Sequence, residues 1–168
     1  MESLSLLELL SFLLLLALSY GSGSNDVAKA IATLVGSGAT NYRTAILWGT
    51  ACCIIGASTS AFITTAMIKT FSEGLVQPGT IIPQTLTVAA LIGAMAWVFL
   101  ASRTGFPVST THALLGSVVG SCVVALSGEV MLWPSIIKNV VLPLLLSPFL
   151  GITLSFLLYP CLKLLTGR

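Results

Sequence analysis

Long stretches without any charged residue dominate this sequence. Asp, Glu, Lys and Arg are absent from residues 9–25, 44–68, 74–102, 104–128 and 139–162. A helix of roughly 20 apolar residues crosses the hydrocarbon core of a bilayer. Only 7% of all residues are charged and 56% are hydrophobic, whereas about 25% of the residues in soluble domains are charged. The pattern predicts an integral membrane protein.

The apolar stretches have the form of helices. Strands of a membrane barrel alternate apolar and polar residues, but the runs at residues 13–16 and 140–146 are continuously apolar. We therefore expect an all-α, polytopic membrane fold in a single transmembrane domain, residues 1–168. Four full spans are expected near residues 4–20, 44–68, 85–101 and 139–165, with broken or re-entrant segments near 21–43 and 102–127.

The same composition excludes other classes of protein. The formal net charge is +2, so the chain lacks the basic face that a nucleic-acid backbone requires. The four cysteines lie in apolar stretches without a C-x-x-C pair, which favours buried small hydrophobic residues over metal ligands. We expect no cofactor and no nucleic-acid partner.

The first polar segment, residues 21–30, predicts a broken helix. Two glycines and two serines precede Asn25 and Asp26, which are favoured residues at a helix N-terminus. A helix end at membrane depth is tolerated only beside a partner or a water-filled cavity. Asp26 could pair locally with Lys29, one turn further on. The sequence favours the other interpretation, a site for Na⁺ or a proton at Asp26 and the Asn25 amide oxygen.

The second polar segment, residues 102–112, has the composition of an anion site. Gly105 and Pro107 are expected to end one helix. Three hydroxyl side chains follow where the next helix is expected to begin: Ser109, Thr110 and Thr111. Hydroxyls and free N–H groups at a helix N-terminus suit an oxyanion such as phosphate or sulfate. The alternative is that the hydroxyls only cap the helix and bond to neighbouring backbone groups.

His112 is the single histidine of the chain. It is a possible accessory residue of the anion site, and the alternative is a buried side chain with a satisfied donor. Ser109 and His112 together could suggest a nucleophile and a base, but no G-x-S-x-G elbow surrounds the serine. We therefore expect a protein that is not an enzyme.

Both polar segments resemble signatures of the inorganic phosphate transporter (PiT) family. Residues 21–30, GSGSNDVAKA, resemble G-A-N-D-V-A-N-A, and residues 106–112, FPVSTTH, resemble P-[VI]-S-T-T-H. The similarity continues through residues 35–39 and 147–151 and is most like an N-terminal repeat. The resemblance implies one half of an inverted-repeat transporter fold, in a multi-pass protein of the cell membrane.

This resemblance implies symport of inorganic phosphate coupled to Na⁺ or H⁺. It assigns phosphate to Ser109, Thr110, Thr111 and Asn25, and the coupling cation to Asp26 and Asn25. Lys29 and His112 are expected as accessory residues beside them. Two residues depart from the family pattern. Lys29 stands where the signature usually has Asn, and Cys53 falls where many relatives carry Glu.

One copy of each signature corresponds to half of a usual family member. A second repeat is therefore expected, from an antiparallel homodimer or from a partner chain. The alternatives are a passive anion channel and a truncated membrane subunit without transport activity. Sulfate and arsenate fit the same residue types as phosphate, and the scattered Lys and Arg residues set no membrane orientation.

Overall fold

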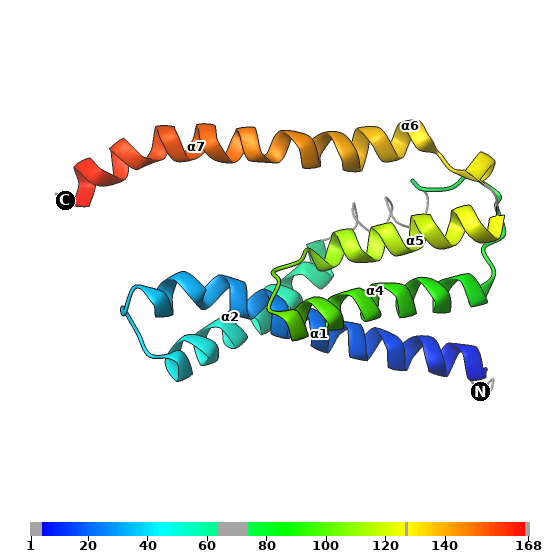
Figure 1. Cartoon of the computed structure of the whole chain (residues 1–168), viewed down its shortest axis with the longest axis horizontal. Helices are drawn as coiled ribbons and strands as arrows, with labels where there is room; N and C mark the ends of the chain where they lie inside the picture. Colours follow the sequence, from blue (N-terminus) through cyan, green and yellow to red (C-terminus); the bar gives the residue numbers. More distant parts are fainter. Residues whose placement is uncertain (1–4, 64–73, 127, 167–168) are drawn as a thin grey trace.

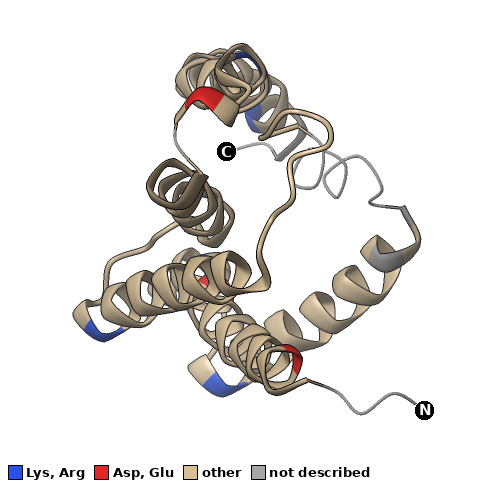
Figure 2. Ribbon diagram, turned by 90° about the vertical axis from the view of Figure 1, so that its right-hand side faces the viewer, with Lys and Arg blue, Asp and Glu red and all other residues tan. Residues whose placement is uncertain are grey.

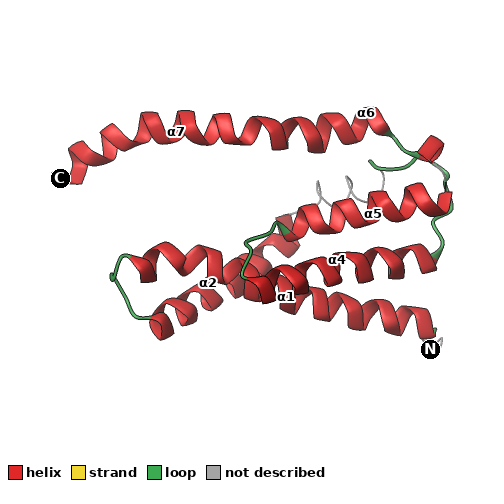
Figure 3. Ribbon diagram, in the orientation of Figure 1, coloured by secondary structure: helices red, strands yellow, loops and turns green. Residues whose placement is uncertain are grey.

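The computed structural model describes residues 5–63, 74–126 and 128–166, and the regular elements in these ranges are helical (Figure 3). They are α1 (Leu6–Gly36), α2 (Tyr42–Ile63), α4 (Gln84–Thr104), α5 (Thr110–Leu126), a 3₁₀ turn (Gly128–Val130), α6 (Trp133–Ile136), a π-helical segment (Ile137–Val141) and α7 (Leu142–Thr166). Within the described residues, three helical stretches are long and apolar enough to cross a membrane: Leu6–Gly36, Gln84–Thr104 and Trp133–Leu164. The predicted all-α membrane fold is confirmed.

The helices form a layered bundle from which the last one stands apart. α4 packs between α1 and α5, and α2 packs against α1 (Figure 1). α7 follows the short helical segments after α5 and runs along the outside of the bundle (Figure 1). All side chains from Val141 to Leu164 are exposed, so α7 leaves a long apolar surface uncovered.

The predicted break at the start of residues 21–43 is wrong, because α1 continues to Gly36. Gly21 is buried, and a Cβ atom there would lie 3.1 Å from the Phe99 ring and 3.2 Å from Val98. The glycine therefore permits close contact with α4 and does not end the helix. The chain turns later, at residues 37–41, where Gly38 adopts a φ of 73°.

The chain leaves the helical conformation between α4 and α5, within the second polar segment. α4 ends at Thr104, and Gly105 follows with a φ of 77°, a left-handed conformation that glycine adopts without strain. Pro107 lies in the extended loop, and α5 begins at Thr110. A turn and a helix start therefore meet at residues 105–109, as the sequence predicts.

Small apolar clusters fix the bundle. One joins α1 to α4 and contains Leu18, Leu91, Ala94 and Val98. Another joins α1 to α2 through Val27, Ile31 and Ala45. The third packs α4 and α5 against the segments around residues 75 and 131: Leu75, Val76, Leu86, Leu115, Cys122, Met131 and Ile136.

Cys122 is buried as expected, whereas Cys52, Cys53 and Cys161 are exposed, which corrects the expectation for these three.

The α4–α5 contact predicts the effect of adding a methyl group. A Cβ atom at Gly93 would collide with the Ser117 hydroxyl, which donates a 2.6 Å hydrogen bond to the Ala90 carbonyl. We expect Gly93→Ala to lower the free energy of unfolding by about 1–3 kcal/mol, because overpacking displaces Ser117. Denaturant unfolding in detergent micelles measures this change.

Gly116→Ala is the matched control for that substitution. It makes the same change in a neighbouring helix, but an added Cβ there meets no atom within 4 Å. Equal stability of the two alanine variants would contradict the observed α4–α5 packing.

Candidate anion and cation site

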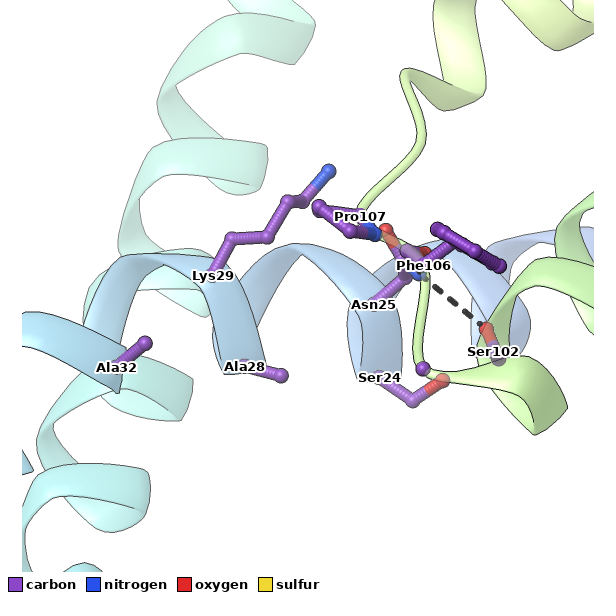
Figure 4. Close-up of a pocket in the computed structure, with 9 residues that line it drawn as sticks. Ser24, Asn25, Ala28, Lys29, Ala32, Ser102, Phe106 and Pro107 are labelled. Atoms are coloured by element: carbon purple, nitrogen blue, oxygen red, sulfur yellow. Dashed lines mark hydrogen bonds between the residues drawn. The ribbon is translucent and has the colours of Figure 1, made fainter.

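Asn25 is a buried polar side chain that joins the two signature segments. It is 8% exposed. Its Nδ2 donates to the Phe106 carbonyl oxygen at 3.2 Å and to Ser102 Oγ at 3.5 Å (Figure 4). Its Oδ1 accepts from the Val108 N–H at 3.3 Å. Phe106 lies 81 residues beyond Asn25 in sequence. One amide therefore holds α1 against the loop between α4 and α5.

Lys29 lies one turn after Asn25 and reaches the same loop. Its Nζ is 2.6 Å from Asp26 Oδ1 and donates a 2.7 Å hydrogen bond to the Val108 carbonyl oxygen. The Lys29 and Asp26 side chains are 35% and 47% exposed. The local pair that the sequence allowed is thus present. Asp26 lies within α1 and does not cap a helix, which corrects that part of the prediction.

Asp26 and Lys29 are charged residues in a largely apolar helix. Charged residues are sparse along the helices, and most turns of the ribbon carry none (Figure 2). A charge in an apolar medium is costly unless it is paired. The contact between Asp26 and Lys29 supplies this pairing within one helix.

Three hydroxyl side chains lie at the start of α5, and one of them, Ser109, takes part in a hydrogen bond. Ser109 Oγ accepts from the His112 N–H at 3.3 Å, and the Ser109 carbonyl oxygen accepts from the Ala113 N–H at 3.0 Å. Ser109 therefore caps the helix, the alternative that the sequence also allowed. In the described ranges, the hydroxyls of Thr110 and Thr111 make no hydrogen bond. Their N–H groups belong to the first helical turn, where intrahelical acceptors are lacking.

Two hollows of about 510 Å³ each border different parts of the 105–109 loop. One lies between α1 and the loop and is lined by Ser24, Asn25, Ala28, Lys29, Ala32, Ser102, Gly105, Phe106 and Pro107. The other is lined by Gly93, Trp97, Val108, Ser109, His112, Ala113, Gly116 and Ser117. Figure 4 shows Asn25 and Lys29 pointing from α1 toward the loop at Phe106 and Pro107.

Four of the seven predicted site residues line these two hollows. Asn25 and Lys29 line the first hollow, and Ser109 and His112 line the second. Asp26, Thr110 and Thr111 line neither. The backbone of Val108 connects the two places, since its N–H contacts Asn25 and its carbonyl contacts Lys29.

Sequence reasoning missed Ser102 and the backbone groups of Phe106 and Val108 as partners of Asn25. The glycine and proline of the loop indicate irregular backbone with unpaired groups. No sequence signal names the side chain that satisfies them, because that side chain lies on α1.

Comparison with known proteins agrees with this architecture. The sequence profile of the phosphate transporter family matches residues 22–168. A protein of Pyrococcus furiosus that bears the name phosphate permease is 35% identical over 159 residues, which cover 92% of this chain and 38% of that protein. A Bacillus subtilis protein named as a low-affinity inorganic phosphate transporter is 32% identical over 166 residues, covering 98% of this chain and 48% of that protein.

A solved structure has the same fold. The sodium-dependent phosphate transporter superposes with a TM-score of 0.75 and 28% sequence identity, over 95% of this chain and 40% of that one. The fold and the matches define a multi-pass membrane protein from a family of transporters.

Within that class, the chain belongs to the phosphate transporter family. It spans 38% to 48% of the length of the two curated relatives described above. This share corresponds to a single repeat.

The hydrogen bonds of Asn25 predict that its replacement will loosen the loop at residues 106–108. Asn25→Ala leaves the partly buried Val108 N–H and Phe106 carbonyl without their partner, which we expect to cost about 1 kcal/mol, the low end of the range for an unsatisfied buried group. We expect lower thermal stability in micelles and faster hydrogen exchange of the Val108 amide. Asn139→Ala is the control, because Asn139 makes only an exposed contact with Ser135. Unchanged exchange at Val108 in Asn25→Ala would contradict the bridge.

Proposed function

We propose that this chain is one repeat of a cation-coupled phosphate symporter, and that its part of the site lies where α1 meets residues 105–111. The observation that carries the proposal is the set of Asn25 hydrogen bonds. These bonds hold the loop that leads into α5 beside the charged pair of α1. Groups suited to an anion and to a cation thereby lie next to each other.

The anion side consists of hydrogen-bond donors. The first turn of α5 offers free N–H groups and the positive end of the helix dipole. Thr110 and Thr111 add two hydroxyls. Ser109 Oγ accepts a backbone bond as the cap, but its own O–H hydrogen is still free to donate. Lys29 adds a positive charge within reach of the same loop, and a charge-assisted bond to phosphate is stronger than a neutral one.

The remaining predicted ligands have distinct roles in this proposal. Asn25 uses both ends of its amide to position the loop, and the second lone pair of its Oδ1 is left for a cation or a water. His112 lies exposed at the rim of the second hollow, where it is an accessory group.

Asp26 is the proposed ligand of the coupling cation. Phosphate in an apolar protein needs compensating charge, and a carboxylate that holds a cation supplies it. Cation and phosphate then bind cooperatively, because each reduces the cost of burying the other. The name of the structural neighbour, a sodium-dependent transporter, supports Na⁺ as the coupling ion, with H⁺ as the alternative.

A second repeat completes the site in this proposal. The chain covers less than half of the length of its relatives. The exposed apolar surface of α7 and the open hollows at the loop leave room for another helical unit. A second copy in antiparallel orientation or a partner chain would supply it, and rocking of the two halves about the site would give alternating access.

Removal of the three hydroxyls tests the anion site. We expect the triple alanine variant of Ser109, Thr110 and Thr111 to lose at least about tenfold in phosphate affinity, equivalent to about 1.4 kcal/mol. Binding of labelled phosphate to the purified chain in micelles measures the affinity.

The control replaces Ser58, Thr59 and Ser60 of α2 by alanine. Thr59 and Ser60 bond to carbonyls of their own helix at 2.8 Å and 3.0 Å, and none of the three residues lines either hollow at the loop. Unchanged affinity in the Ser109–Thr111 variant would reduce that segment to a helix cap and overturn the proposed anion site.

A further inference from the structure

Lys29 occupies the place where a coupling cation would be expected. In the described part of the chain its ammonium group contacts one carboxylate oxygen, of Asp26, and one backbone carbonyl oxygen, of Val108. Hard cations bind oxygen ligands of these two kinds. The proposed cation ligands therefore already contact a positive charge, and this charge is tethered to the protein.

The same ammonium also faces the anion side. Lys29 lines the hollow beside the loop, and a third of its side chain is exposed. An ammonium has three N–H donors, of which the two contacts use two. Lysine is a flexible point charge on four methylene groups, so a small rotation redirects it from Asp26 toward an anion near the start of α5.

We propose that Lys29 couples the two ligands by changing partners. This inference rests on the proposed function. In the empty site the ammonium neutralises Asp26. Phosphate draws the ammonium away and leaves the carboxylate open for Na⁺. Na⁺ at Asp26 in turn repels the ammonium toward the phosphate.

Na⁺ and phosphate are expected to strengthen each other's binding. Without phosphate, Na⁺ must displace an ion pair of 2.6 Å, so its affinity is low. With phosphate bound, the ammonium has another partner and that competition disappears. Because binding linkage is reciprocal, Na⁺ raises phosphate affinity by the same factor.

Phosphate binding with and without Na⁺ tests this role. Isothermal titration of the full chain in micelles gives the phosphate Kd without Na⁺, with choline as the replacement, and at saturating Na⁺. For the unmodified chain we expect Na⁺ to lower the Kd by at least about tenfold. In Lys29→Gln the Na⁺ effect on the Kd should shrink to about threefold or less, because the switching charge is gone and only the direct attraction between Na⁺ and phosphate remains.

Two further variants sharpen the test. Asp26→Asn frees the ammonium, so phosphate binding without Na⁺ should strengthen, while in Lys29→Gln it should weaken. Lys138→Gln removes an exposed lysine far along the chain and should preserve the Na⁺ effect. Thermal unfolding of each variant verifies that it is folded.

The outcomes separate the two proposals. Absence of phosphate binding by the unmodified chain would overturn the proposed function. A Na⁺ effect of unchanged size in Lys29→Gln would overturn the role of Lys29 and leave the symporter proposal standing. A phosphate Kd independent of Na⁺ in the unmodified chain would also overturn the partner exchange, because Lys29 would then be a permanent counter-ion of Asp26.

Discussion

The structure depends on one buried amide. Asn25 satisfies a carbonyl, an N–H and a hydroxyl that lie on the far side of a helix–helix contact. Without this side chain, the extended loop after α4 would have to leave its backbone groups unpaired or turn them to solvent. The amide therefore sets where the loop lies, where α5 begins and how near Lys29 comes to the Val108 carbonyl.

Charge neutralisation is the second constraint on this site. Asp26 and Lys29 sit on a helix that is long and apolar enough to cross a membrane, where an unpaired charge is costly. The ion pair between Asp26 and Lys29, one turn apart, removes this cost. In the proposed mechanism a bound ligand can separate the two side chains again. In this mechanism, Asp26 and Lys29 neutralise each other when no ligand is bound. The same two residues make the binding of Na⁺ depend on the binding of phosphate.

The sequence predicts the parts of this structure that depend on local patterns. Charge-free stretches predict the helices, and Gly105 with Pro107 predicts the turn before α5. The expected break at Gly21 fails for a physical reason. A glycine beside serines is typical of a turn, but here close contact with Phe99 and Val98 selects the glycine, and the helix keeps its own hydrogen bonds. The partners of Asn25 depend on a contact between distant segments, which no local pattern encodes.

A crystal structure of the chain with arsenate, an anomalous scatterer with the charge and shape of phosphate, tests the central claim most directly. The account predicts an anomalous peak beside the first turn of α5, within hydrogen-bond distance of the Thr110 or Thr111 hydroxyl, with the Lys29 ammonium turned toward it. Ordered arsenate bound elsewhere, with Lys29 still on Asp26, would contradict it.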